Sequence, residues 1–324
     1  MRIAVMGAGS IGRIVGAYLS KGNEDVLLVD TNKEHVKVMN KQGLKIDGVV
    51  DEILPVRAIT PEELSGRFDL VFCCVKALKN REALNMLLPY LVPESVVVIL
   101  QNGIQEDEIA SIIGEDRTIG GITGWAATYM GPGYITKTSG GAFVIGELDG
   151  RITDLIKEIA NILKKVEPVS DSDDIYAHIW LKLLVNASMS GMGTVLGCPF
   201  DEIIGYKEAM QAVRVIWKEG TEVGKALGVN PVSIRGMAPM SKGGPRSQLG
   251  VKGGKASMMQ DIEKGIKCEI DYLNGYIVMK GKEVGIKTPV NEAVTRIIRE
   301  IEEGRRKMGP QNLDDIKLSS NPTV

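Results

Sequence analysis

Hydrophobic and polar positions in the first half of the chain alternate in the pattern of a parallel α/β sheet. Short apolar runs rich in β-branched residues predict strands at 3–6, 26–29, 70–75 and 96–100. Between the last two runs, leucines recur at i, i+3, i+4 and i+7 over residues 84–91, which is the spacing of one helix face. Strands that alternate with helices indicate βαβ units and a parallel sheet.

The pattern changes after residue 169, where apolar residues recur mainly at helical spacing. Long helical segments are predicted near 172–190, 202–228, 255–284 and 290–304. Pro168 and the Ser/Asp-rich stretch 170–174 suggest a boundary. We therefore expect a dinucleotide-binding domain over 1–169, a helical domain over 170–308 and a flexible tail over 309–324. The glycine-rich stretch 238–254 is expected to be a loop.

The first predicted strand leads into a glycine-rich turn with the spacing G-x-G-x-x-G. Its residues are Gly7, Ala8, Gly9, Ser10, Ile11 and Gly12. A strand precedes the turn, a helical pattern follows it, and Asp30 ends the second predicted strand. This context is typical of a dinucleotide site, where the helix N-terminus binds the pyrophosphate. A carboxylate at position 30 would bind the ribose hydroxyls and repel a 2′-phosphate, which favours NAD(H), although Lys33 keeps NADP(H) open.

Two other predicted strand ends carry polar side chains. Lys76 follows the strand at 70–75, and Asn102 follows the strand at 96–100. Ligands of open α/β sheets lie at the carboxyl ends of strands, so both residues are candidate cofactor contacts, and Asn102 is also a candidate substrate contact. The alternatives are a solvated surface lysine and a turn-forming Asn-Gly pair.

A polar stripe interrupts the apolar helical segment at 172–190. Lys182, Asn186 and Ser190 are spaced at i, i+4 and i+8, which places them on one helix face with a drift of about 40° per step. Apolar residues surround Lys182, and lysine is rarely buried without a partner. The lysine therefore either extends to solvent or serves a site.

The segment 255–284 also carries polar candidates. Glu269 and Asp261 lie beside its expected buried face, where a solvated acidic edge is the alternative. The isoleucines that mark this buried face are Ile262, Ile266, Ile270 and Ile277. On one continuous helix, Ser257 and Glu269 would point about 120° apart, so periodicity does not unite them.

Composition narrows the class of protein. The 324 residues contain 39 basic and 41 acidic side chains, and this balance offers no basic field for nucleic acid or a membrane surface. The longest apolar runs, such as 95–100, are much shorter than the roughly 20 residues of a membrane span. Four cysteines without a C-x-x-C pair fit a reducing cytoplasm. Two histidines leave little scope for a metal cluster or a Ser-His-Asp triad, so we expect no metal.

Several motifs in order resemble the ketopantoate reductase (2-dehydropantoate 2-reductase) family over about residues 1–300. The segments that carry the resemblance are the glycine-rich turn, Val75-Lys76, 101–103, 180–186, 257–261, 268–275 and 288–291. The resemblance implies an α/β protein with an N-terminal Rossmann-like parallel-sheet domain and a C-terminal all-α domain, with the active site in the cleft between them. It also implies reduction of ketopantoate to pantoate, a step towards pantothenate and coenzyme A.

The resemblance assigns roles to individual residues. Lys182 matches the family's catalytic lysine and Glu269 its active-site glutamate. Substrate-contact positions are matched by Asn102, Asn186 and Ser257, and Lys76 matches a lysine near cofactor and substrate. Three positions depart from familiar members. Ser190 and Gly254 stand where asparagines often contact the substrate, and Asp30 stands where a basic residue commonly reads the phosphate of NADPH.

These observations predict a 2-keto acid reductase in which hydride passes directly from the nicotinamide to the C2 carbonyl. Lys182 would supply the proton and stabilise the developing negative charge. One alternative is an NAD-dependent 2-hydroxyacid dehydrogenase on the same scaffold, favoured by Ser190 and Gly254. Another is a non-catalytic dinucleotide sensor. The apolar faces of the C-terminal helices leave a homodimer open.

Overall fold

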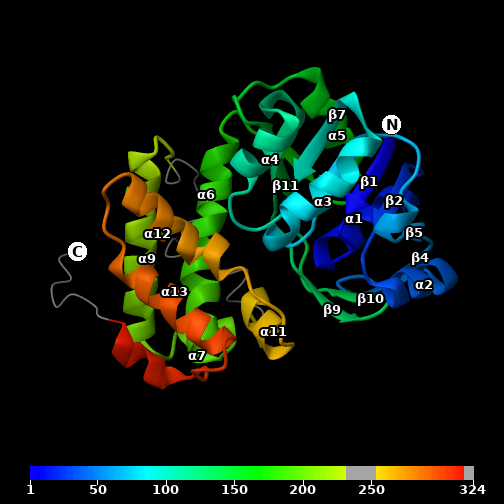
Figure 1. The fold of residues 1–324 in the computed structure, drawn as a ribbon. Helices are drawn as coiled ribbons and strands as arrows, with labels where there is room; N and C mark the ends of the chain where they lie inside the picture. Colours follow the sequence, from blue (N-terminus) through cyan, green and yellow to red (C-terminus); the bar gives the residue numbers. More distant parts are fainter. Residues whose placement is uncertain (231–252, 317–324) are drawn as a thin grey trace. The chain divides into compact units, whose positions relative to one another are not determined.

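The computed structural model describes residues 1–230 and 253–316. The chain divides into two units (Figure 1): Met1–Gln101 with Gln105–Tyr176, and Asn102–Ile104 with Ala177–Val324. Most of the glycine-rich stretch expected to form a loop at 238–254 lies outside the described residues.

The first unit is built on a mainly parallel eight-stranded sheet in the order β12-β11-β8-β7-β6-β1-β2-β5. Its pairs are parallel except β11 with β8. The strands are β1 Arg2–Met6, β2 Asp25–Val29, β5 Ala58–Ile59, β6 Phe68–Cys73, β7 Leu91–Ile99, β8 Thr118–Thr123, β11 Phe143–Glu147 and β12 Val169–Asp171. All four predicted strands are present, and the predicted α/β class with a parallel N-terminal sheet is confirmed.

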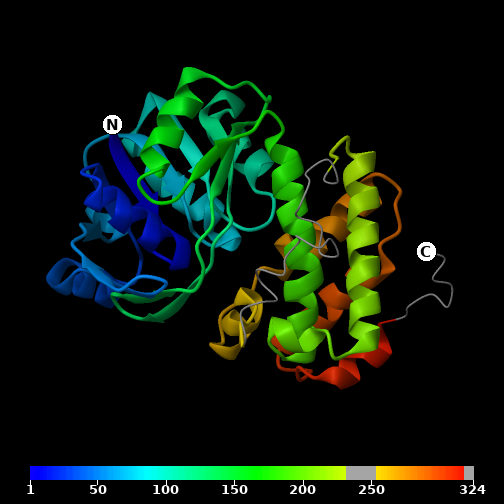
Figure 2. The same ribbon diagram turned by 180° about the vertical axis from the view of Figure 1, so that it is seen from behind.

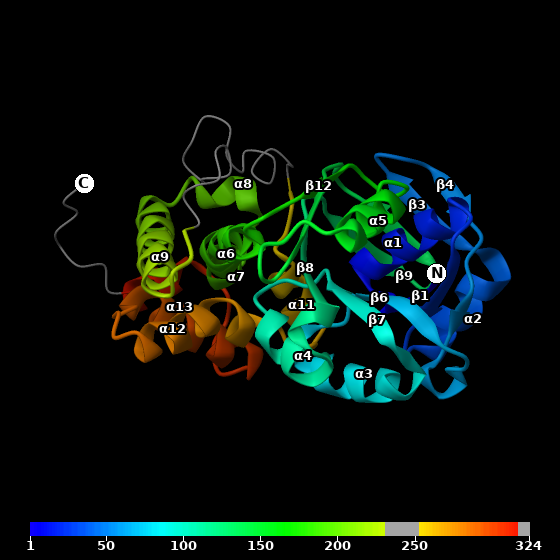
Figure 3. The same ribbon diagram turned by 90° about the horizontal axis from the view of Figure 1, so that it is seen from above.

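Helices cover both faces of this sheet. They are α1 Ser10–Lys21, α2 Lys33–Gln42, α3 Asn80–Leu87, α4 Glu106–Ile113 and α5 Asp154–Leu163, with 3-10 turns η1 Pro61–Glu63, η2 Ala77–Lys79, η3 Leu88–Tyr90 and η4 Glu115–Arg117. Figure 3 shows α1 and α5 on one face and α3 and α4 on the other. Alternate strand residues therefore enter different cores: Ile3 and Val5 pack with α1 and α5, whereas Ala4 and Met6 pack with α3 and α4.

A second, four-stranded sheet in the same unit was not predicted. Its order is β4-β3-β10-β9, with β3 Leu44–Gly48, β4 Glu52–Leu54, β9 Ala127–Gly131 and β10 Tyr134–Lys137. The strands have three to five residues and come from two distant segments of the chain. Such short non-local strands leave little periodicity to detect.

The first unit extends to Tyr176, past the boundary expected after residue 169. The reason is that β12, Val169–Asp171, pairs in parallel with β11 and completes the sheet. A Ser/Asp-rich stretch that sequence composition assigns to a linker is thus partly a strand.

The second unit is helical, and Figure 2 shows it from behind. Its elements are α6 Ile175–Val185, the π-helical turn η5 Asn186–Ser190, α7 Gly191–Leu196, α8 Phe200–Ile203, α9 Lys207–Ala226, α11 Ser257–Glu263, η7 Ile270–Tyr272, α12 Asn274–Glu283, α13 Pro289–Glu302 and η8 Pro310–Asp315. The indole N–H of Trp180 donates to the carbonyl of Gly220 at 3.0 Å. A Cβ on Gly224 would lie 2.6 Å from that indole nitrogen, so glycine permits the close approach of α6 and α9.

Two expectations for this unit need correction. The segment 255–284 is not one helix. Helix α11 ends at Glu263, Gly265 has a left-handed conformation at φ +68°, and the chain is non-helical from there until η7 and α12. Ile266, expected on the buried face, is consequently 50% exposed. Part of the expected flexible tail is packed, because Asn312 is buried and its amide donates to the carbonyl of Val195 at 2.9 Å. Residues 317–324 of that tail lie outside the described part.

One helical segment of this protein is longer and more apolar than the short apolar runs noted in the sequence. The helical run Ile175–Leu196 is long and apolar enough, by length and composition only, to cross a membrane. Within the most apolar 18-residue stretch of this run, 83% is buried inside the protein. Burial of this kind is typical of a core helix, and the run contains the candidate residue Lys182.

Candidate active site

The glycine-rich turn has the geometry that its spacing predicts. Gly7 has φ +89°, and its N–H donates to the carbonyl of Val29 at 2.9 Å. A Cβ on Gly12 would lie 2.1 Å from the Gly7 carbonyl oxygen, so only glycine fits. A Cβ on Gly9 would meet no described atom within 4 Å. The backbone at Gly9 is therefore open to the approach of a ligand.

Helix α1 begins at Ser10 directly after this open position. Gly9 is its N-cap, and within the described residues no side chain caps the helix. The N–H groups of the first helical turn, including those of Ser10 and Ile11, are available to an anion, and the helix dipole favours negative charge there. The turn and helix can thus hold a dinucleotide pyrophosphate.

Asp30 follows β2 and is held in a tight turn. Its Oδ1 accepts a hydrogen bond from the backbone N–H of Asn32 at 2.8 Å. The Asn32 side chain in turn caps α2 by accepting from the N–H of His35 at 3.0 Å. Lys33, the residue considered as a phosphate partner, is exposed on the first turn of α2. The turn therefore fixes one oxygen of the Asp30 carboxylate just after the end of β2.

A buried amide network links the segments that carry Lys76 and Asn102. The Gln101 amide donates to the carbonyl of Val75 and to Asn80 Oδ1, both at 2.6 Å. Val75 precedes Lys76 and Gln101 precedes Asn102 in the chain. The carboxyl ends of β6 and β7 are therefore tied together by side chains that the sequence did not single out.

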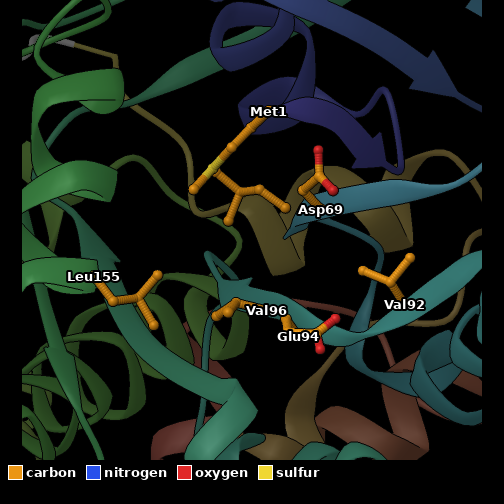
Figure 4. A pocket seen from close by; sticks show the side chains of 7 residues that line it. Met1, Asp69, Val92, Glu94, Val96 and Leu155 are labelled. Atoms are coloured by element: carbon orange, nitrogen blue, oxygen red, sulfur yellow. The ribbon is translucent and has the colours of Figure 1, made fainter.

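A pocket of about 300 Å³ lies elsewhere in the first unit (Figure 4). It is lined by Met1, Asp69, Leu70, Val92, Glu94, Val96 and Leu155. Most of the lining comes from the amino-terminal side of the sheet: Met1 precedes β1, and Asp69 and Leu70 begin β6. The other residues come from β7 and, for Leu155, from α5. Ligands of parallel sheets bind at the carboxyl ends of the strands, so this pocket is not the candidate cofactor site.

In the second unit, the structure brings Asn102 and Asn186 together. The Asn186 amide donates to Asn102 Oδ1 at 3.3 Å. Asn186 begins the π-helical turn that ends at Ser190, and Ser190 is 7% exposed. In an α-helix, side chains four residues apart differ in direction by about 40°. A π-helical turn has more residues per turn and rotates less per residue, so it brings Ser190 back towards the direction of Lys182. Such turns are frequent at functional sites.

Lys182 lies one turn before Asn186, and its surroundings change its acidity. Burial lowers the pKa of Lys182 to about 8, and the nearby carboxylate of Glu269 opposes that change. Glu269 is 6% exposed and directly precedes η7. The two residues that match the family's catalytic lysine and active-site glutamate therefore interact electrostatically.

Ser257 is the first residue of α11 and is exposed. Its interaction with a substrate stays a prediction.

A second buried network supports the π-helical turn. Glu219 accepts from the backbone N–H groups of Val290 and Asn291, each at 3.0 Å. The Asn291 side chain accepts from Asn274 at 2.9 Å, and Asn274 also donates to the carbonyl of Ala187 within the turn at 3.1 Å. We assigned no role to these asparagines from the sequence, although both lie in segments that carry the resemblance.

Among the residues that the structure describes, no group of three or more His, Cys, Asp or Glu side chains could hold a metal ion. The candidate residues supply backbone N–H donors, amides, hydroxyls, carboxylates and the amino groups of Lys76 and Lys182.

Comparison with known proteins extends over both units. Residues 3–150 match the family described as ketopantoate reductase PanE/ApbA, and residues 174–302 match its C-terminal family. The 2-dehydropantoate 2-reductase of Pyrococcus abyssi is 32% identical, covering 92% of this chain and 97% of the relative. That of Archaeoglobus fulgidus is 28% identical, covering 94% and 98%.

Solved structures show the same relationship. A D-mandelate dehydrogenase with NADH and anilino(oxo)acetate has a TM-score of 0.84 at 26% identity, covering 94% of this chain and 99% of that chain. A PanE/ApbA family ketopantoate reductase from Ralstonia eutropha has a TM-score of 0.82 at 27% identity with the same coverage. The chain therefore belongs to the ketopantoate reductase family of NAD(P)H-dependent oxidoreductases.

Proposed function

We propose that this enzyme reduces ketopantoate to pantoate, with NADH as the preferred reductant, in the route to pantothenate and coenzyme A. The observation that carries the proposal is Lys182, a lysine whose pKa is lowered to about 8 by burial beside the carboxylate of Glu269. The names of relatives that match nearly the whole chain support the choice of substrate.

Lys182 acts as the proton donor. The dinucleotide, when bound, supplies the hydride for the C2 carbonyl of the keto acid. Negative charge then develops on the carbonyl oxygen, where an ammonium group both stabilises it and transfers a proton. At a pKa of about 8, the lysine is mostly charged at neutral pH and is a stronger acid than an ordinary lysine.

Glu269 keeps Lys182 charged. Burial alone would lower the lysine pKa further, and the Glu269 carboxylate opposes that effect. The Lys182 ammonium is therefore acidic enough to donate a proton, yet it stays mostly protonated at neutral pH.

The amides and hydroxyls orient the keto acid. Asn186 Nδ2 lies 3.3 Å from Asn102 Oδ1. The other donors and acceptors of these two amides can bind the carboxylate or hydroxyl groups of the substrate. Ser190, buried at the end of the same turn, and Ser257 at the start of α11 are the other proposed contacts. Holding the substrate in one orientation lowers the entropic cost of the reaction.

The NADH preference rests on Asp30. Its carboxylate, fixed by the Asn32 N–H, accepts hydrogen bonds from ribose hydroxyls and repels a 2′-phosphate. Two structural neighbours, both of D-mandelate dehydrogenase, are described with NADH. Exposed Lys33 and the NADPH dependence of family members argue for NADP(H) as the weaker alternative.

A second function is favoured by a specific observation. The smaller residues Ser190 and Gly254, together with likeness to D-mandelate dehydrogenase, suit an NAD-dependent 2-hydroxyacid dehydrogenase. Steady-state assays of ketopantoate, 2-ketoisovalerate and benzoylformate, each with NADH and NADPH, distinguish the two. The highest kcat/KM with ketopantoate supports our proposal, whereas a clear preference for benzoylformate contradicts it. Dinucleotide binding without turnover of any keto acid would instead identify a sensor.

We also propose a cytoplasmic homodimer. The four cysteines, all within the described residues, are free thiols, which fits a reducing compartment. A related ketopantoate reductase from Staphylococcus aureus is described as dimeric. Fractionation of cells and sedimentation of the purified chain test the two statements separately.

A further inference from the structure

The glycine-rich turn packs on a cluster of buried Arg13, buried His35 and half-buried Tyr129 that the proposed chemistry does not use. Arg13 and His35 are each 2% exposed. The Arg13 guanidinium carbon lies 4.5 Å from the centre of the Tyr129 ring, and the His35 ring meets the same tyrosine edge to face. A fully buried arginine on the first helix of a dinucleotide domain requires an explanation, because it must satisfy its donors inside the protein.

Arg13 directs its donors at backbone carbonyls on both sides of it. Its Nε donates to Ala8 O at 2.7 Å and to Gly9 O at 3.1 Å. Its Nη1 donates to Tyr134 O at 3.3 Å, and to Gly131 O at 3.5 Å. Burial lowers the pKa of Arg13 to about 10, so the guanidinium remains charged at neutral pH. One side chain therefore joins the glycine-rich turn to the β9–β10 hairpin.

His35 makes a parallel connection. The backbone N–H of Gly133, in the same hairpin, donates to His35 Nδ1 at 3.0 Å, so this nitrogen carries no proton. The proton is then on Nε2, which donates to Ala8 O at 3.2 Å. Burial lowers the pKa of His35, in agreement with a neutral ring. The carbonyl of Ala8 thus has two side-chain donors, from α1 and from α2.

These contacts determine where the ligand-binding N–H groups point. In a trans peptide unit the C=O and the following N–H face opposite ways. Donors that hold Ala8 O therefore turn the Gly9 N–H away from the cluster, and the bond to Gly9 O does the same for the Ser10 N–H. Both N–H groups lie at the open start of α1, where a Cβ on Gly9 would meet no described atom.

We propose that Arg13 and His35 are positioning residues, which aim the Gly9 and Ser10 N–H groups at the pyrophosphate of a dinucleotide and brace the turn against the hairpin. Arg13 also places a fixed positive charge behind the turn, which favours the phosphates. This inference rests on the proposed function, because it assumes that the turn binds a dinucleotide.

The test measures the binding of NADH and of two competitors, ADP and adenosine, to the full chain. ADP carries the pyrophosphate and adenosine does not. In Arg13→Met we expect affinity for NADH and ADP to fall about 10-fold to 100-fold, because the pyrophosphate loses aligned N–H donors and a nearby positive charge. Affinity for adenosine should stay within about twofold. At saturating NADH and keto acid, kcat should stay within about twofold of the unmodified enzyme.

Conservative variants separate positioning from charge and from folding. Arg13→Lys keeps the positive charge but loses the several N–H donors of the guanidinium group. We therefore expect its affinity for ADP to lie between those of Arg13→Met and the unmodified protein. His35→Gln keeps a donor for Ala8 O and should bind ADP more tightly than His35→Leu. Arg57→Met, which changes an exposed arginine paired with Asp25 in the same unit, is the control and should leave all affinities unchanged.

Each result distinguishes the inference from its premise. If the unmodified chain does not bind NADH, the proposed function fails before any variant is compared. If it binds NADH but Arg13→Met binds ADP equally well, the positioning role is refuted. An equal loss of ADP and adenosine affinity in Arg13→Met would show that the substitution disturbs the structure of the first unit as a whole, and it would also overturn the inference.

Discussion

The lowered pKa of Lys182 makes a prediction about the pH dependence of the reaction. If the Lys182 ammonium donates the proton, kcat/KM for keto acid reduction should be level below pH 8 and fall about tenfold per pH unit above it. The sign follows from the direction of the pKa change: the charged form is present below about 8 and is lost as the pH rises through that value. Oxidation of the hydroxy acid needs the neutral amine and should show the opposite dependence.

Substitution of Lys182 tests the assignment of that pKa. Lys182→Ala should lower kcat/KM by roughly 10²–10⁴, the effect of losing one acid catalyst, and should abolish the break near pH 8. Lys182→Arg keeps a cation whose pKa is far above 8, so weak residual activity should show no break there. Affinity for the dinucleotide should change little in either variant, because the glycine-rich turn belongs to the other unit.

The assay is the initial rate of NADH consumption across pH 5.5–9.5 at low keto acid, with melting temperatures measured in parallel. Lys218→Ala removes an exposed lysine of the same unit and is the matched control. Near wild-type turnover in Lys182→Ala would remove this lysine from the mechanism. A break that stays near pH 8 in Lys182→Arg would assign the pKa to another group.

Three further predictions concern the neighbours of Lys182 and the cofactor. Glu269→Gln should lower turnover in a folded protein and move the break in the pH profile of kcat/KM below 8, because the Glu269 carboxylate of the unmodified enzyme raises the Lys182 pKa. A variant that keeps full specific activity but loses stability would instead show that Glu269 is structural. Asp30→Ala should reduce the ratio of kcat/KM for NADH over NADPH, and an undiminished ratio would refute the role of the carboxylate. Asn274→Ala should raise KM for the keto acid about tenfold more than KM for NADH, because it releases the carbonyl of Ala187 in the turn that carries Asn186; equal changes in both constants would contradict this role.

The dinucleotide half of the site was predictable because local sequence determines it. Gly7 and Gly12 are required by the backbone itself, through a positive φ and a close approach to a carbonyl, so their spacing carries the geometry. Asp30 could be placed because it directly follows a short, continuous apolar run that is typical of a buried strand.

The helical half was predictable only in outline. The stripe of Lys182, Asn186 and Ser190 was visible at helical spacing, but the π-helical turn that aligns it has no sequence signal of its own. Helical periodicity gave no reason to place Glu269 near Lys182, and only the resemblance assigned both residues to one active site.

The cluster beneath the glycine-rich turn could not be predicted from spacing at all. Arg13 lies among apolar residues of α1 and would ordinarily be assigned to solvent. Its acceptors Gly131 and Tyr134 are more than 100 residues away, in a hairpin of the unpredicted second sheet. Non-local backbone carbonyls decide the role of this arginine, and no local pattern encodes them.

Transfer of the label from deuterated NADH is the most direct test of the central claim. The enzyme is incubated with ketopantoate and NADH deuterated at the transferable C4 position, and the product is examined by NMR. Direct hydride transfer predicts pantoate with one deuterium at C2. Absence of pantoate, or pantoate whose C2 hydrogen comes from solvent, would contradict the account.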